Sequence, residues 1–229
     1  MGSIAEENRK LIARTETFIV PTGKNRPALY ESPFSFPYLQ MQWIRLRMRL
    51  RDRGMMLGAW YTSPRVKGFF NRKIKLRGKV ILPTAIALHK QMYTAFAEKD
   101  TKTLRKICCD GIYNSFVSRM ASRNKGEKWE WKIVKYNGSA RVVSNRMARM
   151  PLDGAAIHQA VVRIKTRQQL TRWVGGKEVP GAKEKDTIEY LVVQRKFWKW
   201  EEGEWEVWGT TEESDWDEVK GNWSLRLLG

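Results

Sequence analysis

The spacing of hydrophobic residues changes once along this chain, and the change separates helices from strands. Between Leu82 and Phe96 apolar side chains recur every three or four positions, which predicts an amphipathic helix of about 15 residues. Two shorter helices are predicted behind it, one starting near Asp100 or Thr101 and one near Asp110. Side-chain oxygens at those positions can accept hydrogen bonds from the free backbone N–H groups of a first helical turn.

Beyond Gly126 the hydrophobic period falls to two, as in a strand with one buried face. The predicted strands cover 129–133, part of 141–149, 155–173, 187–200 and 205–210. Turns are expected at 175–176, 180–181 and 201–204. Three helices followed by four to five long strands predict an α+β domain over residues 80–215. In it the helices cover one face of a curved antiparallel sheet.

Residues 1–79 are interpreted as an N-terminal extension that forms an extended basic arm, and residues 216–229 as a C-terminal tail. Four prolines, Pro21, Pro27, Pro33 and Pro37, argue against a long helix in residues 1–40. From 41 to 53 arginines alternate with apolar residues. As a strand this pattern puts every arginine on one face, and as a helix it distributes them around the axis. Either form suits a phosphate-lined groove, and a solvated edge strand is the alternative.

Charge is the strongest compositional signal. The chain has 43 Lys and Arg against 24 Asp and Glu, a net charge of +19. Residues 41–79 hold 12 basic and 1 acidic residue, whereas residues 201–229 hold 2 basic and 9 acidic residues. Such an excess opposes compaction unless nucleic-acid phosphates or anionic lipids neutralise it. A merely basic soluble surface is the alternative.

RNA is the favoured partner because glycines, cations and aromatic residues are interleaved between residues 65 and 79. The candidate RNA-contact residues are the cations of the extension: Arg45, Arg47, Arg49, Arg51, Arg53, Arg65, Lys67, Arg72, Lys73, Lys75, Arg77 and Lys79.

Sequence motifs for catalysis or cofactor binding are absent, and we expect a non-enzymatic protein with no catalytic residue, metal or cofactor. His89 falls on an apolar stripe, where a lone histidine is usually a core residue, and His158 lies far along the chain. Adjacent Cys108 and Cys109 are poorly placed for a disulfide and suit a reducing compartment. The sequence around them predicts a helix, in which cysteine behaves as a small buried hydrophobic residue. No run of 18 apolar residues occurs, and residues 1–10 do not form a secretory signal. A cleaved presequence is left open.

A family resemblance rests on the helical segment between Pro83 and Arg123 and the strands after it. The helical segment contains LHKQMYTAFAEKDTKTLRKICCDGIYNSFVSRM, and the strands contain SARVVSNRMARM and AAIHQAVVRIKTRQQL. This pattern resembles the Tim-forty-four-like domain over residues 80–215. That domain is a cone-shaped α+β fold related to nuclear transport factor two. It occurs in the anchoring subunit of the mitochondrial import motor, in the mitochondrial large-subunit ribosomal protein numbered L-forty-five in animals, and in fungal membrane receptors for the mitoribosome.

The many cations of residues 41–79 and the net charge of +19 fit the ribosomal branch of this family better than the import-motor branch. That resemblance implies a matrix protein at the inner membrane, near the polypeptide exit of the large ribosomal subunit. Its expected partners are rRNA, neighbouring ribosomal proteins, the inner-membrane surface and the insertion machinery, with no small-molecule substrate.

Two alternatives remain. One is a peripheral inner-membrane or protein-import adaptor that does not bind rRNA. The other is a ligand-binding or enzymatic member of the wider fold, with a pocket lined by Met92, Phe96, Phe116 and Trp131. A buried carboxylate or histidine facing that pocket would favour this last hypothesis.

Overall fold

The computed structural model describes residues 36–68, 70–179 and 184–219 and divides into two compact units. One unit comprises residues 1–47 and 212–229, and the other comprises residues 48–211. In the first unit Met41, Ile44, Trp216 and Val219 are buried, and residues 216–219 are helical. Most of the predicted extension, the expected turn at 180–181 and the tail beyond 219 lie outside the described residues.

Residues 41–53 belong to a helix, so the extended basic arm is wrong for this part of the chain. Helix α2 runs from Phe36 to Thr62, with Pro37 in its first turn, where the missing N–H is not needed. The alternation of arginines hid a second pattern, in which the buried residues of α2 follow helical spacing. These buried residues are Met41, Ile44, Asp52, Met56, Ala59 and, just beyond the end of the helix, Ser63.

Three helices follow the short β1–β2 hairpin (Arg65–Lys67 and Asn71–Arg72). They are α3 (Gly78–Glu98), α4 (Thr101–Ile107) and α5 (Asp110–Ala121), as the pattern predicted, although α3 starts before Pro83 and includes it. Asp100 caps α4 by accepting hydrogen bonds from the backbone N–H groups of Lys102 and Thr103. Asp110 is not a cap. It lies inside the first turn of α5 and accepts a hydrogen bond from Arg105 at 2.6 Å.

The main sheet is antiparallel and has seven strands, because two short strands join the five long ones. The long strands are β3 (Glu127–Tyr136), β4 (Arg141–Arg149), β5 (Ala156–Val174), β7 (Glu184–Trp198) and β9 (Glu206–Thr211). The short ones are β6 (Lys177–Glu178) and β8 (Glu201–Glu202).

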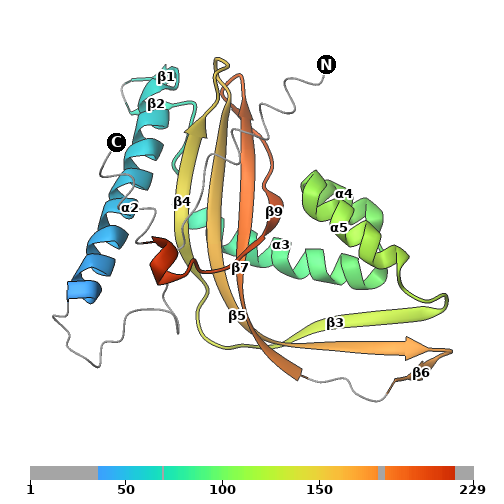
Figure 1. Cartoon of the computed structure of the whole chain (residues 1–229). Helices are drawn as coiled ribbons and strands as arrows, with labels where there is room; N and C mark the ends of the chain where they lie inside the picture. Colours follow the sequence, from blue (N-terminus) through green and yellow to red (C-terminus); the bar gives the residue numbers. More distant parts are fainter. Residues whose placement is uncertain (1–35, 69, 180–183, 220–229) are drawn as a thin grey trace. The chain divides into compact units, whose positions relative to one another are not determined.

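Strand β5 is the longest and organises the sheet. Along one edge its first half pairs with β4 and its second half with β3, while β7 runs along the other edge. Figure 1 shows how strongly β5 and β7 bend between these two halves.

Helices α3, α4 and α5 cover one face of this bent sheet (Figure 1). Met92, Leu104 and Phe116 pack there against inward-facing residues of β5, β7 and β9. The helical stripe of α3 and the alternation of the strands therefore meet in one core. A second cluster joins Met56 and Ala59 of α2 to Ile74 and to the ends of β4, β5 and β7.

The turn after β7 lies two residues earlier than predicted. Lys199 and Trp200 have positive φ values of 49° and 66°, and β8 begins at Glu201. The backbone N–H of Trp200 donates to the carbonyl oxygen of Gly154 at 2.9 Å. A Cβ atom on Gly154 (φ +71°) would lie 2.8 Å from the Cα of Lys199, so the contact between the two turns requires glycine.

We expect Gly154→Ala to destabilise the fold by about 1–3 kcal/mol, because it combines a left-handed backbone with a steric clash. Gly176→Ala is the matched control. Its φ is +79° but no atom lies within 4 Å of the added Cβ, so it reports the backbone cost alone. Urea unfolding measures both variants. Equal destabilisation of the two would show that the approach of Gly154 to Trp200 does not matter.

Candidate functional site

Residues 65–79, which we call the basic segment, present cations on an anchored and partly extended backbone. The segment carries seven cations and no carboxylate. Burial alternates at its centre: Arg72 and Ile74 are buried, whereas Lys73 and Lys75 are exposed. The inward side chains of Arg72 and Ile74 hold the segment, while the side chains of Lys73 and Lys75 face solvent. Its other exposed cations are Arg65, Lys67, Arg77 and Lys79.

Arg72 differs from the other predicted RNA contacts because it is buried, with 5% of its surface exposed. Its guanidinium donates hydrogen bonds to the carbonyl oxygens of Tyr61 and, at 2.8 Å, of Ser63, next to the end of α2. It also lies over the rings of Trp60 and Tyr61, at 5.0 and 4.9 Å. Arg72 therefore satisfies carbonyl groups at a helix C-terminus, and we remove it from the candidate phosphate contacts.

A pocket of about 470 Å³ lies beside the basic segment and has mixed charge. Lys73, Lys75 and Arg77 line it together with Glu201 and Glu202. Glu202 accepts a hydrogen bond from Arg195 at 2.7 Å and another from the backbone N–H of Lys75 at 3.3 Å. These contacts tie the segment to the β7–β8 hairpin. With two carboxylates in its wall, the pocket is poorly suited to a phosphate, and the outward ends of the cations remain the candidate contacts.

The five predicted arginines of α2 lie on a different element from the basic segment. Arg47, Arg49, Arg51 and Arg53 are exposed, and Arg45 is half-buried. Because the segment is helical, they are distributed around the axis and do not form the single arginine face that a strand would give. No described helix is both long and apolar enough to span a membrane.

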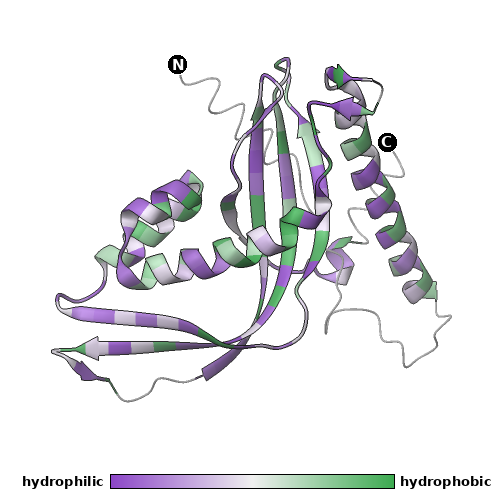
Figure 2. Ribbon diagram, turned by 180° about the vertical axis from the view of Figure 1, so that it is seen from behind, coloured by the Kyte–Doolittle hydropathy of each residue, from purple (hydrophilic) through white to green (hydrophobic). Residues whose placement is uncertain are grey.

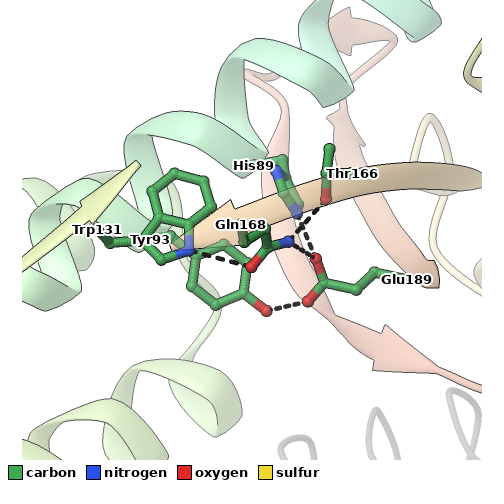
Figure 3. A network of polar contacts seen from close by, with 6 residues as sticks. All are labelled: His89, Tyr93, Trp131, Thr166, Gln168 and Glu189. Atoms are coloured by element: carbon green, nitrogen blue, oxygen red, sulfur yellow. Dashed lines mark hydrogen bonds and ion pairs between the residues drawn. The ribbon is translucent and has the colours of Figure 1, made fainter. Parts of the chain in front are cut away.

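A partly buried polar network, with His89 fully buried, lies between α3 and the sheet (Figure 3). Three donors meet the Glu189 carboxylate of β7: His89 Nε2 at 2.7 Å, Gln168 Nε2 at 2.7 Å and the Tyr93 hydroxyl. The indole N–H of Trp131 donates to Gln168 Oε1 at 3.0 Å. A buried histidine thus meets a partly buried carboxylate in the domain, which is the observation that would favour a catalytic site.

Contacts within the network account for the shifted pKa values of Glu189 and Tyr93 without a ligand. Burial raises the pKa of Glu189, but the hydrogen bonds from His89, Tyr93 and Gln168, together with the charge of His89, outweigh it and hold that pKa below its usual value. Burial and the neighbouring carboxylate raise the pKa of Tyr93. The groups are therefore engaged with one another, and their arrangement ties α3 to β5 and β7.

Sequence reasoning placed His89 in the core but missed its partner. Glu189 is two residues before Leu191 and four before Val193, both buried in the core. Strand alternation therefore put its carboxylate on the inward face, and that was the available signal. Met92, Phe96, Phe116 and Trp131, predicted to line a pocket, are packed instead. Met92 and Phe116 are buried, and Phe96 contacts Phe116 with ring centroids 4.7 Å apart.

The two cysteines are free thiols that lie between α4 and α5, not inside a helix as predicted. Cys108 is buried in the core. Cys109 donates a hydrogen bond to Glu206 at 3.4 Å and accepts one from Gln194 at 3.0 Å. Burial, together with the Glu206 charge, raises the pKa of each thiol to about 12, so neither is an activated nucleophile.

Arg123 and His158 also have structural roles. Arg123, just beyond the end of α5, is buried: it donates to the Ala97 carbonyl oxygen at 3.0 Å, and its guanidinium lies 3.8 Å from the centroid of the Trp129 ring. Burial and the nearby charge of Arg195 lower the pKa of His158 to about 3, which keeps this histidine neutral. Among the described residues, no group of three or more His, Cys, Asp or Glu side chains is arranged to hold a metal ion.

The Glu189 network gives a prediction on pH-dependent stability. Because the pKa of Glu189 is lowered in the fold, its ionised form stabilises the protein above the unfolded-state pKa. This contribution disappears as the pH falls through the folded-state pKa. We expect Glu189→Gln to lower the free energy of unfolding at neutral pH by about 1.5–3 kcal/mol and to flatten its decline in acid. Glu130→Gln removes the same charge from an exposed site on β3 and should change neither. Denaturant unfolding across the pH range is the measurement.

The basic segment gives a second prediction, which separates inward from outward cations. Arg72→Ala leaves buried carbonyl groups without their donor and should cost about 1–3 kcal/mol of stability. Lys73→Ala and Lys75→Ala should each remain within about 0.5 kcal/mol of the parent, as exposed substitutions do. Thermal unfolding followed by circular dichroism compares the three. A stable Arg72→Ala variant would contradict the structural role of Arg72.

Comparison with known proteins places this structure in a family. No curated protein matches the chain. A crystal structure of the intermembrane space region of chloroplast protein ARC6 aligns with 60% of this chain and 97% of its own, at 10% identity and a TM-score of 0.38, which carries no argument about fold or function. The family described as MBA1-like protein matches residues 61–224. The chain therefore belongs to the MBA1-like protein family, whose members have a mitochondrial, membrane-associated function.

Proposed function

We propose that this protein is a non-catalytic component of the mitochondrial large ribosomal subunit, near the polypeptide exit in the matrix. It binds rRNA and tethers the ribosome to the inner membrane, so that new chains reach the insertion machinery as they are made. The observation that carries the proposal is the basic segment, with its exposed cations on an anchored backbone, in a chain of the MBA1-like family.

The rRNA contacts are assigned to the basic segment and not to α2. Lys67, Lys73, Lys75, Arg77 and Lys79 are exposed, and the buried Arg72 and Ile74 anchor the backbone between them. Cations held on an ordered backbone can meet successive phosphates with little loss of conformational freedom. The α2 arginines lie beside exposed apolar side chains, which a phosphate backbone would not cover.

A non-catalytic role is supported by how the buried ionisable groups are used. The carboxylate of Glu189 receives three hydrogen bonds from within the fold, and the two thiols have raised pKa values. General acid–base catalysis and nucleophilic catalysis both require a group that is poised toward a substrate. The His89–Glu189 pair is better explained as a structural link between α3 and the sheet.

The proposal predicts the salt dependence of ribosome binding. Replacing Lys67, Lys73, Lys75 and Arg77 by glutamine should weaken binding to purified mitochondrial large subunits. It should also reduce the slope of log K against log salt by about 3, since each lost phosphate contact removes 0.7–0.9. Co-sedimentation over a salt series gives both quantities.

A matched control removes the same charge elsewhere on the second unit. Lys90, Lys102, Lys106 and Lys177 are also exposed, and their replacement by glutamine should leave the slope within about 1 of the parent. Equal losses of affinity in the two variants would show that ribosome binding depends only on the net charge of the protein, and would contradict the assigned interface. A parent protein that remains unbound at every salt concentration, and binds only membranes, would favour an adaptor without rRNA contacts.

A further inference from the structure

Helix α2 exposes a second apolar stripe, which nothing in the core explains. Its members recur every three or four residues over most of the helix, and each is at least 48% exposed. They are Phe36, Leu39, Trp43, Leu46, Leu50, Leu57 and Tyr61. We call these seven residues the outer stripe.

The outer stripe lies opposite the buried stripe of the same helix. With 3.6 residues per turn, each residue advances by about 100°, so the two stripes are centred roughly 180° apart. α2 is one continuous helix, and its faces follow from this repeat alone. Figure 2 shows apolar and polar bands alternating along α2.

Arginines flank the outer stripe on both sides. The helical repeat puts Arg47 and Arg51 along one border and Arg49 and Arg53 along the other. Asp52 is the one acidic residue between 36 and 62. Its side chain is 12% exposed and accepts a hydrogen bond from Ser144 of β4, so it faces the sheet. The outer face of α2 is therefore apolar at its centre, cationic at both edges and free of carboxylates.

We propose that the outer face of α2 lies flat on an anionic phospholipid bilayer, with the outer stripe between the lipid headgroups and the arginines on their phosphates. The inference rests on the membrane half of the proposed function and names the element that performs it. A helix with Trp, Phe and Leu on one side and basic residues at its borders is the usual form of an interfacial helix. Trp43 and Tyr61 are the aromatic types enriched at membrane–water boundaries.

Other occupants fit this chemistry less well. RNA phosphates would pair with the arginines but leave the leucines against polar backbone. A partner helix packed on the outer stripe would need acidic residues opposite both rows of arginines, as charge pairing across a helical seam requires. An anionic bilayer meets both needs, because its phosphates face the arginines while its acyl region accepts the apolar side chains.

The experiment is flotation of the full chain with phospholipid vesicles in the absence of ribosomes. One set contains only phosphatidylcholine, and another also contains about one fifth anionic phospholipid. The parent chain should float with the anionic set, with about fivefold weaker binding for each of Arg49→Gln and Arg53→Gln. Leu46→Glu combined with Leu50→Glu should weaken partitioning by at least about tenfold, since both side chains leave the apolar region.

The matched control carries the same two added charges on other exposed apolar residues. Leu46 and Leu50 are 48% and 56% exposed, and Leu152 and Ile188, outside α2, are 49% and 53% exposed. Leu152→Glu combined with Ile188→Glu should float like the parent. Circular dichroism and unfolding temperature establish that both double variants are folded.

Three results would overturn the inference. The Leu46→Glu/Leu50→Glu variant could float as well as its control, or the parent could fail to float with anionic vesicles. The parent could also be a dimer by light scattering that this variant dissociates, which would assign the outer stripe to a second copy of the chain.

Ribosome binding is measured separately on the same proteins. The Leu46→Glu/Leu50→Glu variant should still co-sediment with large subunits. If the Leu46→Glu/Leu50→Glu variant loses vesicle binding but keeps ribosome binding, the result supports the role of α2 at the membrane. Ribosome binding by the basic-segment variant tests the proposed function independently.

Discussion

The requirement that every buried backbone group of β5 be paired shapes this structure. Strand β5 spans 19 residues and is paired along both edges, with β7 on one side and β4 followed by β3 on the other. Unpaired N–H and C=O groups in the interior would each cost free energy comparable to a lost hydrogen bond. β5 and β7 bend between the segments that pair with β4 and with β3, and α3, α4 and α5 fill the face so formed (Figure 1).

The same principle explains the buried charges. The Glu189 carboxylate is on the helix-covered side of the sheet because strand alternation puts it there, and it is stable only with donors from α3 and β5. Arg72 and Arg123 are comparable: Arg72 donates to two main-chain carbonyl oxygens and Arg123 to one, and both guanidinium groups lie over aromatic rings. In a strongly basic chain, these internal cations support the fold.

Two kinds of basic surface follow from two kinds of backbone. The basic segment turns Arg72 and Ile74 inward and leaves its other cations exposed on an anchored backbone, which suits a line of phosphates. Helix α2 buries one stripe and exposes another, so its arginines border an apolar face, which suits a lipid surface. Membership of the MBA1-like family fits a protein that engages a membrane.

The sequence by itself determined the α+β class, the order of three helices before the long strands, and the burial of His89 and Cys108. These features depend on hydrophobic periodicity and on helix capping, and both are determined by residues close together in the sequence. Only the tertiary structure decided that 41–53 is helical. Alternating arginines fit a strand as well as a helix, and it is the burial of Met41, Ile44 and Asp52 at helical spacing that distinguishes the two. The tertiary structure also decided that Arg72 and Arg123 point inward and that Glu189 meets His89. These contacts join residues far apart in the chain, and their free energy depends on which polar groups are brought together away from water.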